Sequence, residues 1–356
     1  CVAQAEGELI QKRAPYVDLV IGPQSIQSLN HFLQKSDLSQ TSITDFDVIE
    51  KFDTLNQIKR NQNSKSAFVT IQEGCDKFCH FCVVPYTRGS EYSRTVYEIE
   101  DEVKSLVDLG VVEFTLLGQN VNAFHGSDAS GQSHSLASLI DKVSQINGVE
   151  RITYSTSHPV NMTDDLIELH GINHKLMPFL HLPVQSGSDK ILKLMNRKHT
   201  RDFYFDIIEK VRKAKPNIAL SSDFIIGFPG ETQKDFEDTL DLIRRIKYMN
   251  SYSFKYSPRP GTPAANKEEI NKDILDERLA ITQELLDEQQ MEYNRNFITK
   301  TVKVLIDGAG KLEGQIKGKS EFNQSVALQG EENHIGQIIP VQIKDVKMHS
   351  LIGERA

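Results

Sequence analysis

Three cysteines lie within eight positions of one another in the segment "EGCDKFCHFC", residues 73–82. Cys75, Cys79 and Cys82 have the spacing C-x3-C-x2-C, and the fourth cysteine of the chain is Cys1. A closed zinc site normally takes four ligands, commonly in two CxxC-like pairs, and no second pair occurs here. His80 would be a strained fourth ligand because it lies inside the loop. Cysteine thiolates are the usual ligands of iron–sulfur clusters, and three of them would leave one iron of a four-iron cluster open to a substrate or cofactor. Zinc, a disulfide and plain core cysteines are the alternatives.

The three cysteines follow a strand-like run, and further runs of this kind recur along the chain. We predict strands at residues 67–72, 113–119, 151–157, 179–185, 219–228 and 251–257, separated by helices of 3.6-residue apolar period. Strands that alternate with helices indicate parallel pairing, in an open doubly wound sheet or a partial (β/α) barrel. In both folds the chemistry gathers at the carboxyl ends of the strands, where the cysteines lie.

The remaining segments differ from this pattern in composition and periodicity. Residues 1–35 have the pattern of the end of an α/β domain, and residues 36–65 are polar without a sustained period, which predicts a linker. Residues 66–292 are the predicted barrel with a connecting helix. Residues 293–356 contain short strands punctuated by glycine, which predicts a small all-β barrel.

Composition limits the possible partners and surroundings. The net charge of −8 and the pI near 5.8 give no global attraction to nucleic acid. The apolar runs are far shorter than the roughly 20 residues that span a bilayer, so we expect no membrane partner. Four cysteines in 356 residues do not make a disulfide scaffold, which favours a cytoplasmic location.

Several longer motifs resemble one family. The cysteine triplet after the first strand is similar to the radical S-adenosylmethionine (SAM) superfamily. Five stretches resemble its methylthiotransferases, in particular the branch that modifies tRNA: "GCDKFCHFCVVPYTRGSEYSR" (74–94), "TLLGQNVNAF" (115–124), "FLHLPVQSGSDKILKLMNRKHT" (179–200), "DFIIGFPGET" (223–232) and "FKYSPRPGTPAA" (254–265). The end of the chain resembles the RNA-binding TRAM domain. This resemblance implies a partial (β/α)6 barrel between an α/β remnant and a TRAM-like β-barrel.

The resemblance also implies the site. Cys75, Cys79 and Cys82 would hold a catalytic 4Fe-4S cluster whose open iron binds SAM. Residues at the strand ends would contact SAM, and they are Phe81, Gly118, Gln119, Asn120, Gln185, Ser186, Gly227, Pro229, Gly230 and Ser257. Arg88, Arg94 and Arg259 are candidates for contacts to RNA or substrate. Structural roles in turns, loops and surface ion pairs are the alternatives for these residues.

The implied reaction adds a methylthio group to C2 of N6-dimethylallyladenosine beside the tRNA anticodon, with two SAM molecules. The alternatives within the superfamily act on threonylcarbamoyl-adenosine in tRNA or on a ribosomal protein. An alternative of another class is a non-enzymatic, zinc-stabilised RNA-binding protein. We further expect an external electron donor, a sulfur donor that the sequence does not identify, and a monomer.

Two features depart from the family pattern. The family carries a second, auxiliary 4Fe-4S cluster on three N-terminal cysteines, and Cys1 resembles the last of these. We therefore expect a fragment whose full-length form holds the second cluster, and which by itself cleaves SAM without completing sulfur insertion. In residues 300–356 the charges nearly balance and Phe322 is the one aromatic side chain, so RNA binding there rests on the resemblance.

Overall fold

The computed structural model describes residues 1–26, 29–34, 41–44 and 64–356. Six strands run parallel in two three-stranded sheets, in the orders β3-β6-β7 and β10-β9-β8. Their bounds are β3 (Ser66–Thr70), β6 (Glu113–Leu117), β7 (Arg151–Tyr154), β8 (Phe179–His181), β9 (Ala219–Ile226) and β10 (Asn250–Lys255). A parallel bridge between Ile152 and Leu176 links the two sheets, just ahead of β8. This arrangement confirms the predicted partial (β/α)6 barrel, in which β3 and β10 are the open edges.

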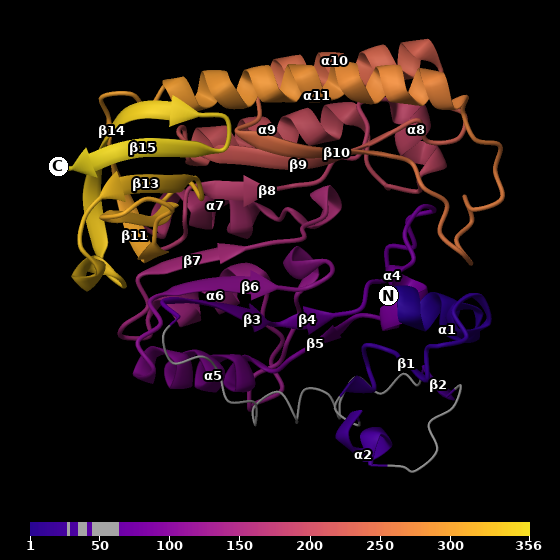
Figure 1. Ribbon diagram of the computed structural model, residues 1–356, viewed down its shortest axis with the longest axis horizontal. Coiled ribbons are helices and arrows are strands. Elements are labelled where there is room, and N and C mark those ends of the chain that lie inside the picture. Colours follow the sequence, from indigo (N-terminus) through magenta and orange to yellow (C-terminus); the bar gives the residue numbers. More distant parts are fainter. Residues whose placement is uncertain (27–28, 35–40, 45–63) are drawn as a thin grey trace.

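Helices cover the outer face of this barrel (Figure 1). They are α5 (Val96–Asp108), α6 (Leu136–Ser144), α7 (Asp164–Ile172), α8 (Asp189–Leu194), α9 (Arg201–Ala214) and α10 (Gln233–Ile246). The start of α5 shows how the sequence sets their bounds, because Thr95 accepts a hydrogen bond from the Glu98 amide and Glu98 accepts one from the Thr95 amide. Such a capping box satisfies two backbone donors that have no partner inside the helix.

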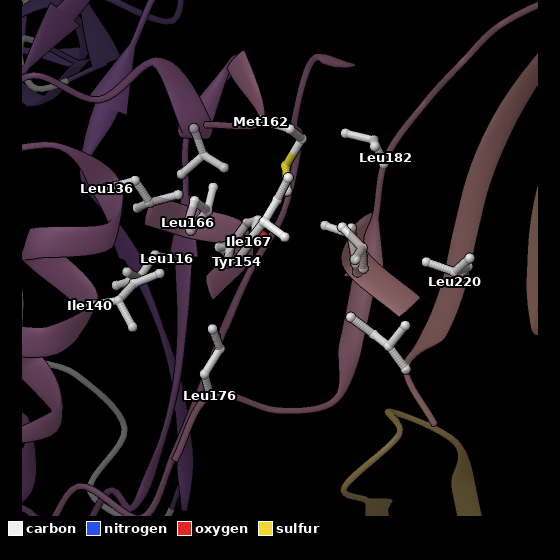
Figure 2. Packing of buried hydrophobic residues seen from close by; sticks show 14 of the residues in the cluster. Leu116, Leu136, Ile140, Tyr154, Met162, Leu166, Ile167, Leu176, Leu182 and Leu220 are labelled. Carbon is white, nitrogen blue, oxygen red and sulfur yellow. The ribbon is translucent and has the colours of Figure 1, made fainter. Parts of the chain in front are cut away.

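One continuous hydrophobic core joins strands and helices (Figure 2). Leu116 and Tyr154 lie on neighbouring strands and contact this core together with Ile140 of α6 and Ile167 of α7. All four side chains are at most 5% exposed. Burial of this kind stabilises the fold by about 25 cal/mol per Å² of apolar surface, which fixes the strand ends that carry the site.

A long helix leads from the barrel to a second domain. α11 (Lys272–Arg295) runs along the molecule to a closed barrel of strand order β11-β12-β13-β15-β14 (Figure 1). The strands are β11 (Thr301–Ala309), β12 (Gln315–Ser320), β13 (Ser325–Gln329), β14 (Ile338–Lys347) and β15 (Ser350–Arg355). The small all-β barrel predicted at the end of the chain is therefore present.

The two barrels share a packed interface. Phe179, Ala219 and Met249 from the amino-terminal ends of strands or just before them belong to the same hydrophobic cluster as Phe297 and Phe322 of the second domain. Figure 1 places the β-barrel at this end of the parallel sheets and α4 (Val84–Arg88), which follows the cysteines, at the other.

The N-terminal segment forms a small unit of its own. It contains α1 (Val2–Arg13), β1 (Leu19–Ile21), α2 (Leu29–Leu33) and β2 (Thr41–Ile43). β1 and β2 pair in parallel, so part of the predicted linker over residues 36–65 is a strand instead. The rest of that linker lies outside the described residues, apart from Thr44 and its last two positions. α1 packs against α4, beside the cysteine loop (Figure 1).

Candidate active site

The cysteine loop begins at a glycine that no other residue could replace without strain. Gly74 has a φ of +77°, and a Cβ atom on it would lie 2.0 Å from the carbonyl oxygen of Ser90. The Gly74 amide donates to Oε1 of Gln119 at 2.7 Å, and its carbonyl accepts from Nε2 of Gln72 at 2.7 Å. Two glutamine side chains therefore fix the backbone just before Cys75.

A second segment, the turn after α8, anchors the far side of the loop. Nδ1 of His80 lies 2.8 Å from the carbonyl oxygen of Leu194, and Nδ2 of Asn196 donates to the carbonyl of Phe78 at 2.9 Å. His80 is thus engaged with the backbone. Nη1 of Arg197 lies 3.6 Å from the sulfur of Cys79, within hydrogen-bonding reach of that atom.

The three thiols are free and largely shielded from solvent. Cys79 is buried, and Cys75 and Cys82 are half-buried. Burial raises the pKa of the Cys75 thiol and raises that of Cys82 to about 11, so metal binding must displace their protons. In the described part of the chain no three His, Cys, Asp or Glu side chains form a group that could hold a single metal ion. A four-iron cluster spreads its cysteine ligands over separate irons, so this donor set suits a cluster better than zinc.

The end of β6 meets the cysteine loop directly. Oε1 of Gln72 accepts from the amides of Gln119 at 2.8 Å and Asn120 at 3.1 Å, and a Cβ on Gly118 would lie 2.4 Å from that same oxygen. Gly118 is therefore required for close approach of the two strand ends. Oδ1 of Asn120 is buried without a hydrogen-bond partner among the described residues, as is expected for an atom that faces a polar ligand.

The turn after β9 is tightly built. Gly227 and Gly230 have φ values of +74° and +90°, and Pro229 between them is buried. The Gly227 amide donates to a carboxylate oxygen of Glu231 at 3.2 Å, and the other oxygen of Glu231 accepts from Arg278 of α11 at 2.8 Å. This ion pair holds the turn in place against the long helix.

The other predicted SAM contacts occupy different surroundings. Gln185 has a φ of +78° and pairs with Phe224 through the backbone. Ser186 is 1% exposed, and its hydroxyl lies 3.3 Å from that of Thr239 on α10. The same hydroxyl accepts from the amide of Ser188, the residue that caps α8, at 3.2 Å. Ser257 is exposed in the loop that follows β10.

Phe81 contributes to a small cluster at the site. It is half-buried and packs with buried residues that include Met195, Phe228 and Tyr256. This packing covers only part of the Phe81 side chain. Phe81 also stands between Cys79 and Cys82 in the sequence, next to the thiols.

The three candidate arginines differ in burial and in their ion pairs. Arg94 is 1% exposed and pairs with Glu102 at 2.5 Å, so it is a buried structural residue with no surface for RNA. Arg88 is part-buried and pairs with Glu73 at 2.6 Å, at the base of the cysteine loop. Arg259 alone of the three is exposed.

Three polar residues of the site were not predicted from the sequence, namely Arg197, His158 and His199. Arg197 is 5% exposed, and the two histidine rings lie 5.8 Å apart. Burial, with Arg197 nearby, lowers the pKa of His158 and lowers that of His199 to about 4, so both rings are neutral at neutral pH. The Nε2 atoms of both rings have no hydrogen-bond partner in the part of the chain that the structure describes. For Arg197 and His199 the signal was the polar "NRKHT" end of a motif already quoted, whereas His158 lies outside every quoted motif.

The geometry defines a class of protein. A cysteine triplet at the carboxyl end of the first strand of a partial barrel, with a closed β-barrel at the opposite end, fits a radical SAM protein with an appended TRAM-like domain. The family model of the radical SAM superfamily matches residues 69–243, and that of the TRAM domain matches residues 295–355.

Curated relatives identify the family within this class. The tRNA-2-methylthio-N(6)-dimethylallyladenosine synthase of Rickettsia felis is 53% identical over 358 residues, which cover 99% of this chain and 80% of the relative. The protein of the same name from Rickettsia canadensis is 54% identical with the same coverage. The chain belongs to this family of radical SAM tRNA methylthiotransferases, which confirms the family, the enzyme class and the fold predicted from the motifs.

A solved structure shows a more distant likeness. Coproporphyrinogen III oxidase (HemN) from Escherichia coli, a radical SAM enzyme, is 14% identical, with a TM-score of 0.46 over 78% of this chain and 71% of that chain. Separately, the described part of the chain has no helix long and apolar enough to cross a bilayer.

Proposed function

We propose that this protein adds a methylthio group to C2 of N6-dimethylallyladenosine beside the anticodon of tRNA, in the cytoplasm. The observation that carries the proposal is the anchored cysteine loop, whose three thiols lie at the carboxyl end of β3 in a chain that shares 53% of its residues with synthases of that name. A 4Fe-4S cluster with SAM, as the radical SAM family uses them, would supply hydrogen abstraction and the methyl group.

The protein's own residues position and shield that chemistry. Cys75, Cys79 and Cys82 would hold the cluster, and Arg197 would donate to the Cys79 sulfur and stabilise negative charge on it. The unpartnered Oδ1 of Asn120 would accept from the amino group of SAM. The remaining SAM contacts are Phe81, Gly118, Gln119, Gln185, Ser186, Gly227, Pro229, Gly230 and Ser257.

Cys1 would belong to a separate, auxiliary cluster. It is exposed at the start of α1, and α1 packs against α4, which follows the three cysteines in the chain. The electron donor would be an external molecule.

SAM cleavage tests the assignment of the cysteines. The chain, reconstituted without oxygen with iron and sulfide and given a low-potential reductant and SAM, should produce 5′-deoxyadenosine. Cys79→Ala should abolish this product, and Cys1→Ala should leave it unchanged, because Cys1 lies outside the catalytic triplet. Absence of 5′-deoxyadenosine from the unaltered chain, or full activity of Cys79→Ala, would contradict the proposal.

A further inference from the structure

A segment after β10 crosses the open side of the barrel and reaches the cysteine loop. Residues 257–267, which we call the strap, run from the end of β10 toward α4 (Figure 1). The amide of Ala264 in the strap donates to the carbonyl of His80 at 3.1 Å. Because β10 and β3 are the two open edges of the parallel sheets, this hydrogen bond joins the last strand of the barrel to the loop that follows the first.

The strap is tightly folded where it makes this contact. Thr262 donates to the Arg259 carbonyl through its amide at 3.1 Å and through its hydroxyl at 2.8 Å, and the Ala265 amide donates to the Thr262 carbonyl at 3.0 Å. Ala264 is fully buried and belongs to the small hydrophobic cluster against which Phe81 packs. The position of the Ala264 amide is therefore fixed both by the turns of the strap and by packing.

The Ala264 amide fixes the central peptide of a turn between two cysteines. The Cys82 amide donates to the Cys79 carbonyl at 2.9 Å, which closes a four-residue turn. In such a turn the central peptide, here between His80 and Phe81, can present its carbonyl on either side, and type I and type II turns differ in this way. The hydrogen bond from Ala264 selects one of the two orientations. Because a trans peptide is planar, its N–H points opposite to its C=O, and the Phe81 amide therefore points away from the strap.

Backbone amides of the cysteine loop already donate to sulfur atoms. The sulfurs of Cys75 and Cys82 each accept a hydrogen bond from the backbone amide two positions further along the chain. Phe81 has the same relation to Cys79, yet its amide has no acceptor among the described residues. Phe81 is half-buried, and backbone amides that are shielded from water nearly always have an acceptor. The free amide therefore indicates an acceptor that binds within the loop.

We propose that the strap positions the Phe81 amide as a hydrogen-bond donor to a sulfur atom of the catalytic cluster, an inference that rests on the proposed function. Hydrogen bonds to the sulfurs are among the features that set the reduction potential of an iron–sulfur cluster. They favour the reduced form, because hydrogen bonds strengthen as the acceptor becomes more negative. Ala264 is thus a positioning residue, which acts on the cluster through the peptide between His80 and Phe81.

Replacement of a single backbone amide tests this proposal without altering any side chain. Lactic acid incorporated in place of Ala264 converts the amide into an ester, which removes the donor to His80. The chain is reconstituted without oxygen, and the reduction potential of the cluster is measured by a titration followed by electron paramagnetic resonance. The ester should disfavour reduction by about 10-fold, the order of one hydrogen bond to a charged group, which is a shift of about 59 mV to more negative potential for one electron. Electron–nuclear double resonance of the reduced cluster should show one coupled amide proton fewer.

The matched control is the same ester in place of Ala265. It removes a hydrogen bond inside the strap, to the Thr262 carbonyl, and leaves the donor to His80 in place, so the potential should stay unchanged. An unchanged potential in the Ala264 ester, even with a lower Tm, or equal shifts in both esters would overturn the role of the strap and leave the proposed function intact. An unaltered chain that takes up no four-iron cluster would overturn the proposed function itself.

Discussion

Arg197 connects the cysteine loop to the turn after α8. Its Nη1 lies 3.6 Å from the Cys79 sulfur and its Nη2 donates to the carbonyl of Pro183 at 2.5 Å. A cation beside an iron–sulfur cluster stabilises the reduced, more negative form. We expect Arg197→Met to make the reduction potential of the reconstituted cluster more negative in a titration followed by electron paramagnetic resonance. Arg197→Lys, which keeps the charge, should shift it less, and equal shifts in both variants would contradict this role.

The glycines of the turn after β9 provide a test of backbone strain. A Cβ on Gly227 would lie 1.7 Å from Cδ2 of Leu275, whereas a Cβ on Gly261, at a similar φ of +80°, would meet nothing within 4 Å. Gly261→Ala should lower the free energy of unfolding by about 1 kcal/mol, from its left-handed backbone alone. Gly227→Ala should cost about 1–3 kcal/mol more through overpacking. Equal losses in urea unfolding would show that Leu275 moves aside freely.

At the scale of elements, Arg151 at the start of β7 joins the two barrels. Its guanidinium donates to the carbonyls of Lys319 at 3.1 Å and Lys303 at 2.8 Å, and it pairs with Glu113 at 3.5 Å. Arg151 and Glu113 are each at most 5% exposed. Removal of one partner of a buried pair leaves an uncompensated charge, at a cost of about 3–5 kcal/mol.

We therefore expect Arg151→Met to lower the free energy of unfolding strongly. The double variant with Glu113→Gln should recover part of the loss, because no unpaired charge remains. A double variant as unstable as the single one would show that the hydrogen bonds to the TRAM domain, and not the ion pair, stabilise the interface.

A buried histidine ties α7 to β7 and makes stability depend on pH. Nε2 of His170 lies 2.7 Å from the Tyr154 hydroxyl, and burial lowers the pKa of this histidine to about 4. The unfolded chain, with an ordinary pKa of about 6.5, binds the proton first, so stability is lost as pH falls from about 6.5 to about 4. At pH 5 the loss from His170 should be about 2 kcal/mol relative to neutral pH. In urea unfolding His170→Gln should show a smaller loss, and an identical pH dependence would contradict the assignment.

At the scale of the whole molecule, the sequence predicted the architecture more completely than the contacts. Alternating strand and helix patterns located all six strands, and β9 was predicted within two residues at its carboxyl end. The β2 strand was missed because three residues, Thr41–Ile43, carry no recognisable period. A strand this short forms only because β1 is there to pair with it.

In the site, too, the sequence predicted what depends on a local pattern and not what depends on contacts between distant residues. The spacing of the cysteines identified the cluster loop, since that signal is local. Arg197 and Arg94 could not be assigned in this way, because each role depends on a partner elsewhere in the fold. Arg197 meets Cys79 from 118 positions away. Arg94 was a candidate for contact with RNA or substrate, and its buried pairing with Glu102 becomes visible only once α5 packs on β3.

The TRAM domain and α4, which follows the cysteine loop, lie at opposite ends of one packed body (Figure 1). Mass spectrometry of tRNA nucleosides tests the central claim most directly. In the source organism, a strain that lacks the gene should lose 2-methylthio-N6-dimethylallyladenosine and accumulate N6-dimethylallyladenosine, and the intact gene should restore the methylthio group. A strain that keeps the methylthio nucleoside, or loses a different modification, would contradict the account.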